Sequence, residues 1–146
     1  MRTRTVRQSV TFKPSSREVY EVLMDSREHS KFTGDKAIIS RKVGGEFTVG
    51  EYIQGVNLEL VPNEKIVQSW RGSDWPEGHS SRAIFSLRAE GSGTRLTFTQ
   101  TGVPEENYEE TRQGWHDYYW TPMKEMLGPT GKTKQLGLRK PLLTEV

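Results

Sequence analysis

The hydrophobic and polar positions of this chain follow two periods, and the switches between them predict the order of its elements. Apolar and polar residues alternate from Thr5 to Phe12, as in a strand with one buried face. Ser15-Ser16-Arg17-Glu18 forms a capping box, which predicts a short helix, and a further helical turn is expected within residues 27–34. A period of two then returns and predicts six more strands, near residues 37–41, 46–49, 52–61, 65–72, 80–90 and 94–102.

The last predicted element is one long helix between Pro104 and Gly128. Proline and four glutamates at its beginning suit the positive end of the helix dipole, and Gly128-Pro129 is a stop signal. An apolar stripe at helical spacing follows its length. That stripe fits a helix packed on a sheet or a helix that roofs a cavity, and the sequence leaves both open. Its members are Trp115, Tyr119, Pro122, Met123 and Met126.

Two residues of this predicted helix are irregular. Pro122 has no N–H to donate and its ring crowds the carbonyl of Tyr118, so a kink is expected near Thr121. Gly114 is a poor helix former, which predicts that the backbone there lies close to the sheet.

The order of elements predicts an α+β fold. The turns between the predicted strands are short, so neighbouring strands should be antiparallel hairpins. We expect a curved antiparallel sheet of six to seven strands, wrapped around the long C-terminal helix, with short helices after the first strand. The 146 residues suit one domain, predicted at 1–128, followed by a basic flexible tail at 129–146.

Composition and charge exclude several classes of protein. The absence of cysteine rules out disulfides and thiolate sites, and no apolar run is long enough for a signal or a membrane span, so a cytoplasmic location is expected. The net charge is +2, but residues 1–7 carry +3 and residues 129–146 carry +3. The remaining segment, 8–128, therefore carries −4, and we expect neither nucleic-acid nor membrane binding.

Few residues are candidates for catalysis. None of the three histidines belongs to a metal-binding motif. The sequence also contains no nucleotide-binding fingerprint. His79 shares a loop with Asp74 and Glu77 and is a candidate general base, but three polar residues in one loop define no orienting geometry. We therefore predict no catalytic residue, metal or cofactor, and favour a protein that is not an enzyme.

The loop that follows the strand at 65–72 contains an unusual concentration of aromatic residues. Trp70 and Trp75 flank it, and tryptophan is costly to leave exposed. The two side chains are therefore either plugs of the hydrophobic core or parts of a recognition surface.

Two segments give this chain a resemblance to a known family. Val67-Gln68-Ser69-Trp70-Arg71 leading to Trp75-Pro76-Glu77-Gly78-His79, with Thr111-Arg112-Gln113-Gly114-Trp115 downstream, resembles the activator of heat shock protein 90 ATPase family. The likeness is strongest to the C-terminal domain of the eukaryotic co-chaperone and extends over residues 8–128. It implies a helix-grip fold, like that of START domains and pollen allergens.

The resemblance also implies a function. It suggests a non-enzymatic module that contacts a 90-kDa heat-shock chaperone or helps in stress. The 146 residues leave no room for the separate N-terminal domain of the co-chaperone, so binding rather than ATPase activation is expected. The partner-binding residues would be Trp75, Pro76, Glu77, His79, Arg112, Gln113 and Trp115.

A carrier of a small apolar ligand is the alternative hypothesis. Many helix-grip relatives hold such a ligand between sheet and helix, and the aromatic stripe suits that use. The predicted cavity-lining residues are Trp70, Phe85, Phe98, Trp115, Tyr119 and Met123.

Overall fold

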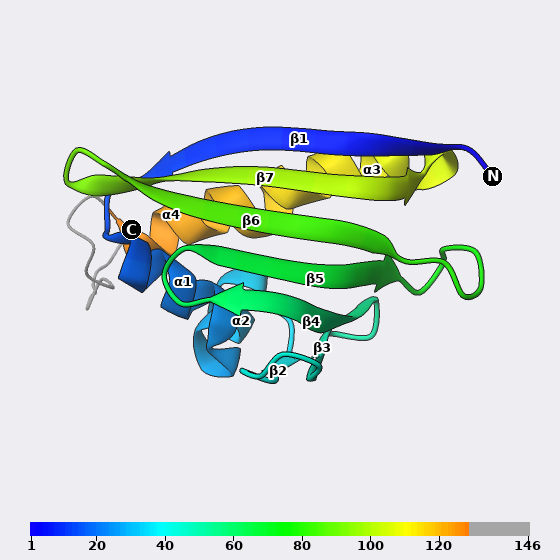
Figure 1. Cartoon of the computed structure of the whole chain (residues 1–146), viewed down its shortest axis with the longest axis horizontal. Coiled ribbons are helices and arrows are strands. Elements are labelled where there is room, and N and C mark those ends of the chain that lie inside the picture. Colours follow the sequence, from blue (N-terminus) through cyan, green and yellow to red (C-terminus); the bar gives the residue numbers. More distant parts are fainter. Residues whose placement is uncertain (129–146) are drawn as a thin grey trace, which may run out of the picture.

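Antiparallel hairpins build one sheet, as the short turns predict. The computed structural model describes residues 1–128, and its seven strands are arranged in the order β1-β7-β6-β5-β4-β3-β2. Figure 1 shows the sheet curving in front of the C-terminal helix. The predicted α+β helix-grip fold is confirmed. The strands are β1 (Thr3–Phe12), β2 (Ala37–Ile39), β3 (Glu46–Val49), β4 (Ile53–Val61), β5 (Lys65–Gly72), β6 (Ser81–Glu90) and β7 (Gly93–Pro104).

Two short helices separate β1 from β2. Helix α1 (Ser16–Met24) begins with the predicted capping box, in which the Ser15 hydroxyl accepts from the Glu18 N–H and the Glu18 carboxylate accepts from the Ser15 N–H. Helix α2 (Ser26–Thr33) begins at the Asp25 cap and ends at Gly34, which has a left-handed conformation. Both helices lie beneath one end of the sheet in Figure 1.

Helix α2 also covers one edge of the sheet. The hydroxyl of Ser26 accepts a hydrogen bond from the Ile39 N–H at 2.8 Å, and that of Ser30 accepts one from the Ala37 N–H at 2.8 Å. These side chains satisfy donors of the short edge strand β2 that no further strand pairs with.

The long C-terminal helix is interrupted in the middle by a wider turn. It consists of a 3₁₀ turn (Glu105–Asn107), α3 (Tyr108–Gly114), a π-helical segment (Trp115–Trp120) and α4 (Thr121–Leu127). The Thr121 N–H donates to the His116 carbonyl, five residues back. Pro122 follows directly and has no N–H to donate, so the irregularity predicted near Thr121 takes the form of a change from π to α geometry.

The π segment shifts the buried face of the helix by one residue. A turn that closes after five residues brings positions i, i+4 and i+5 to one side, so Trp120 is buried together with Trp115 and Tyr119. Met123 and Leu127 continue this face. Of the other residues of the predicted stripe, Met126 is half-buried and packs against the core, and Pro122 is half-buried.

Gly114 does not lie against the sheet, contrary to the prediction. The nearest atom to a Cβ built at this position belongs to the Tyr118 ring, 3.8 Å away on the same helix. The glycine instead leaves room along the surface of the helix.

Residues 129–146, which include the predicted basic tail, lie outside the described residues. None of the helices within 1–128 is both long and apolar enough to cross a lipid bilayer.

Candidate functional site

The loop between β5 and β6 turns one of its tryptophans into the core. Trp75 is only 3% exposed, and its ring centroid lies 5.4 Å from that of Trp70. Trp70 in turn lies 5.5 Å from Trp115 of the helix. The core-plug interpretation therefore holds for Trp70 and Trp75, and Trp75 is not an exposed contact residue as the resemblance implied.

Hydrogen bonds hold this loop on both sides of its tip. Arg71 donates from its guanidinium to the Trp75 carbonyl at 2.9 Å, and His79 donates from Nε2 to the Gly102 carbonyl at 2.6 Å. This bond ties the His79 ring to the last part of β7. Pro76 and Glu77, between the two anchors, are exposed.

The predicted partner-binding residues of the helix also include both surface and buried side chains. Arg112 and Gln113 reach the surface, where Arg112 pairs with Glu109 at 2.8 Å and Gln113 donates to Asp117 at 3.0 Å. Trp115, however, is 2% exposed and belongs to the core. Of the seven predicted partner-binding residues, Trp75 and Trp115 are therefore almost completely buried.

The loop and the helix are connected through the interior rather than across the surface. Trp70 stands between the rings of Trp75 and Trp115. Within residues 1–128 no hydrogen bond or ion pair joins the segment 75–79 to Arg112 or Gln113.

Aromatic side chains fill most of the space between sheet and helix, where an interior cavity was predicted. The rings of Phe98 and Trp115 lie 4.3 Å apart, and those of Phe85 and Phe98 lie 5.0 Å apart. Met123 is fully buried beside them. Trp70, Phe85, Trp115 and Tyr119 help to line a void of about 10 Å³, which has room for about one water molecule.

Polar side chains fix the helix to this filled interior. The Trp115 indole donates to the Gln100 side chain at 2.8 Å, and Gln100 donates to the Ser81 hydroxyl at 2.9 Å. The Trp120 indole donates to Gln8 at 2.7 Å, and Gln8 donates to the Arg112 carbonyl at 3.0 Å, close to the change from α to π geometry. Such satisfied buried bonds specify one position of the helix on the sheet.

An open groove of about 340 Å³ lies where α3 and the π segment meet β3, β4 and β5. We call it the aromatic groove. Trp70, Trp115 and Tyr119, three of the six predicted cavity residues, contribute to it from the core side. It is lined by Thr33, Asp35, Val49, Tyr52, Ile53, Trp70, Glu110, Thr111, Gly114, Trp115, Tyr118 and Tyr119.

The aromatic groove has a negative electrostatic character. Its charged lining residues are Asp35 and Glu110. Burial, together with Asp74 and Glu110, raises the pKa of the Tyr52 hydroxyl. Burial and the charge of Asp35 raise the pKa of the Tyr119 hydroxyl in the same direction. Both tyrosines are therefore neutral hydrogen-bonding groups at ordinary pH.

A buried histidine, which the sequence did not single out, supports the groove from behind. His29 donates from Nδ1 to the Leu23 carbonyl at 2.8 Å, and its Nε2 accepts from the Tyr119 hydroxyl at 2.8 Å. Burial lowers the pKa of His29 to about 4. Tyr119 is 90 residues away along the chain, so no local pattern could have revealed the pair.

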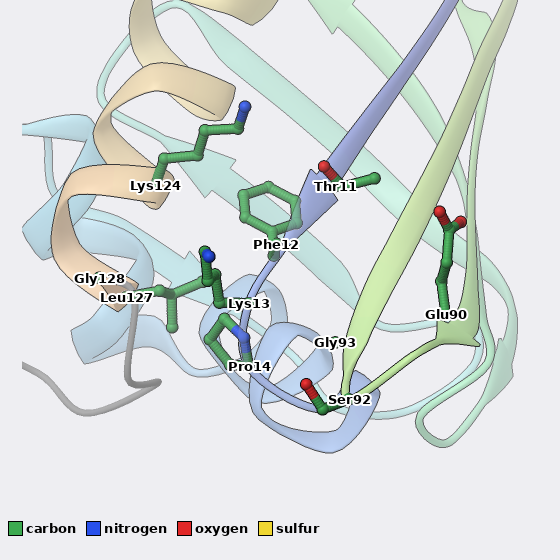
Figure 2. A pocket seen from close by; sticks show the side chains of 10 residues that line it. All are labelled: Thr11, Phe12, Lys13, Pro14, Glu90, Ser92, Gly93, Lys124, Leu127 and Gly128. Atoms are coloured by element: carbon green, nitrogen blue, oxygen red, sulfur yellow. The ribbon is translucent and has the colours of Figure 1, made fainter.

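A second groove, of about 460 Å³, lies at the other end of the helix (Figure 2). We call it the basic groove. Lys124 extends from α4 above the ring of Phe12, while Glu90 and Ser92 stand on the opposite side, at the hairpin between β6 and β7. Lys13 also lines the groove, and none of its residues was predicted as functional. Within the described part of the chain, no group of three metal-ligating side chains occurs.

Comparison with known proteins places the chain in a family. A family profile described as activator of Hsp90 ATPase homolog 1-like protein matches residues 13–128. The chain belongs to this family. Membership confirms the resemblance found in the sequence, and the matched range includes the loop, the helix and the aromatic groove.

Curated members of the activator family are similar to this chain over part of their length. The activator of 90 kDa heat shock protein ATPase homolog 1 of Homo sapiens is 34% identical over 81% of this chain and 35% of its own length. The homologue of Dictyostelium discoideum is 33% identical over 77% of this chain and 30% of its own length. The chain thus spans about a third of the relatives that it matches.

Solved structures show the same fold at lower identity. The crystal structure of an HSP90 activator from Plasmodium falciparum has a TM-score of 0.73 at 22% identity, covering 79% of this chain and 89% of that one. An Aha1 dimer from Colwellia psychrerythraea has a TM-score of 0.74 at 15% identity, covering 87% and 98%.

Proposed function

We propose that this chain is a non-enzymatic binding module that associates with a chaperone of the 90-kDa heat-shock class, in the cytoplasm and in support of the stress response. The observation that carries the proposal is the relationship to curated activators of the 90 kDa heat shock protein ATPase over most of the domain. Because the chain matches only about a third of those relatives, the proposal concerns binding and not ATPase activation.

The loop tip and the outer side of α3 are the proposed contacts. Pro76 and Glu77 lie between the buried ring of Trp75 and the hydrogen-bonded His79, and Arg71 binds the Trp75 carbonyl. A preorganised surface loses little entropy on association. Trp75 acts in this proposal by holding the tip in place. The surface residues proposed to meet the partner are Pro76, Glu77, His79, Arg112 and Gln113.

Titration of the isotopically labelled full chain with the purified chaperone tests this function. Amide shifts at residues 76–79 and 112–113 are expected, and the double variant Glu77→Ala/Arg112→Ala should bind at least about tenfold more weakly. Glu125→Ala, at an exposed position of α4, is the matched control and should bind as the parent does. Shifts that avoid both segments, or no binding, would contradict the proposal.

The ligand-carrier hypothesis has weaker support. A void of about 10 Å³ is far below the roughly 300 Å³ at which small-ligand sites begin. The aromatic groove reaches that size, but it is open to solvent rather than enclosed between sheet and helix.

A further inference from the structure

The aromatic groove combines rings and negative charge in a way that the interior and the basic groove do not. Tyr52 and Tyr118 stand at its rim and are 37% and 63% exposed. Trp70, Trp115 and Tyr119 lie deeper and are nearly inaccessible. Five aromatic side chains, from one turn, one strand and one helix, thus surround a single opening.

The charged groups of this groove are of one sign. The carboxylates of Asp35 and Glu110 make no hydrogen bond or ion pair with any described residue, whereas Glu21, Glu90 and Glu109 each have an arginine partner. At the rim, burial first and then Asp74 and Glu110 raise the pKa of Tyr52.

The backbone leaves room for one of these carboxylates. Gly50 has a φ of +60°, and a Cβ at this position would stand 3.1 Å from the Asp35 carboxyl carbon. A larger residue would adopt this positive φ only with strain, and its Cβ would require a small shift of the carboxylate.

Aromatic faces and carboxylates together favour one chemical class of ligand. The π faces of tryptophan and tyrosine attract cations, and a carboxylate near the ring adds charge complementarity. An anion would be repelled by Asp35 and Glu110, and a neutral apolar group would leave their charge unused. The groove is open on one side, which suits a side chain inserted from outside better than a ligand that must be largely buried.

We propose that the aromatic groove receives an arginine or lysine side chain of the partner protein. The inference rests on the proposed chaperone binding and names the chemistry of one of its contacts. Arginine fits best, because its planar guanidinium stacks on a ring while its N–H groups bind a carboxylate. Arginine, tryptophan and tyrosine are also the residues that most often dominate interface energies.

The first experiment uses a probe that needs no chaperone. The labelled full chain is titrated with N-acetyl-arginine methylamide and, in parallel, with the neutral analogue N-acetyl-citrulline methylamide. The arginine probe should shift the indole N–H signals of Trp70 and Trp115 and bind about tenfold more tightly than the citrulline probe. Equal binding of the two probes, or shifts away from the groove, would overturn the proposal.

Charge-removing variants locate the effect. Asp35→Asn/Glu110→Gln should weaken the arginine probe about tenfold and leave the citrulline probe unchanged. Glu125→Gln removes a single carboxylate from the far end of the helix and should change neither. If tetramethylammonium bound more tightly than the arginine probe, the occupant would be a free small cation and the proposed side chain would be wrong.

The same variants separate this inference from the proposed function. Chaperone affinity that is unchanged in Asp35→Asn/Glu110→Gln would overturn the inference while the function stands. A chain that ignores the chaperone but selects the arginine probe through Asp35 and Glu110 would overturn the proposed function, while the cation selectivity of the groove stands.

Discussion

The aromatic groove and the basic groove lie at opposite ends of the same helix and differ in both charge and lining. The first is lined by Asp35 and Glu110, and the second by Lys13, Lys124 and the single carboxylate of Glu90. Part of this difference serves the helix itself, since acidic residues favour its beginning and basic residues its end. The aromatic lining has no such cause. The charge of each groove therefore follows in part from its place on the helix. The aromatic rings do not, and they are the feature that favours recognition by the aromatic groove.

The filled interior between the two grooves depends on Trp115, which also lies at the floor of the aromatic groove. Replacing Trp115 by alanine should reduce the free energy of unfolding by about 3–5 kcal/mol, because a large cavity forms. The Gln100 side chain would also lose the indole donor that it accepts from. Urea unfolding measures the loss.

Tyr118→Ala is the matched control at the rim of the same groove. Its ring is mostly exposed, so the cost in unfolding free energy should stay below about 1 kcal/mol, although the arginine probe should bind more weakly. If Tyr118→Ala reduced the free energy of unfolding as much as Trp115→Ala, the rim of the groove would be as important for stability as its floor, and this prediction would be wrong.

Acid should destabilise the protein through His29, which is hydrogen-bonded to Tyr119 of the aromatic groove. Burial lowers the pKa of His29 in the folded state to about 4, against about 6.5 when unfolded. Between these two pKa values the unfolded chain therefore binds more protons than the folded chain. The contribution of neutral His29 to stability is complete above pH 6.5 and is lost as the pH falls towards 4. The loss, on the order of 3 kcal/mol, is measurable by urea unfolding at several pH values.

Two variants identify the source of this acid effect. His29→Gln should flatten the pH dependence in that window. Tyr119→Phe removes the hydrogen bond to Nε2 but keeps the ring buried, so it should cost about 1 kcal/mol and preserve the pH dependence. A flat profile in Tyr119→Phe would show that the hydrogen bond, and not burial, sets the pKa of His29.

Gly72 determines where the rim tyrosine lies. A Cβ at this position would stand 2.4 Å from Cζ of Tyr52, so Gly72→Ala should drive that ring away from the groove. Since the ring is partly exposed and can move, the cost should be about 1 kcal/mol, while the arginine probe loses affinity. In a Tyr52→Ala background the same substitution should cost nothing, and an unchanged cost there would contradict the proposed clash.

Periodicity was sufficient for the sheet but not for the face of the helix. Strand β5 matches its prediction at both ends, because Gly72 and the turn at residues 62–64 punctuate an alternating run. The α-helical period leaves Trp120 off the predicted apolar stripe, although its side chain is buried. The π segment depends on how Trp115, Tyr119 and Trp120 pack against the sheet, which no local pattern encodes.

The candidate site was predictable only in part for a similar reason. The sequence identified Trp70 and Trp115 as important rings, but it could not decide between a cavity and a filled core. That choice depends on how closely Phe98 approaches Trp115 across the sheet. Asp35 and Glu110 line the same groove only because the fold brings together a loop and a helix that are far apart in the chain.

The smallest expected effect belongs to the basic groove and tests whether its charge serves only the helix. Lys124 lies in the last turn of α4, so Lys124→Ala should reduce the free energy of unfolding by about 0.3–1 kcal/mol, and less in high salt. Lys42→Ala, in an exposed loop, is the control and should change stability by less than about 0.5 kcal/mol. Binding of the arginine probe should be the same in both variants. Tighter binding of the arginine probe to Lys124→Ala, but not to Lys42→Ala, would show that the two ends of the helix are electrostatically coupled. The aromatic groove would then not be an independent site.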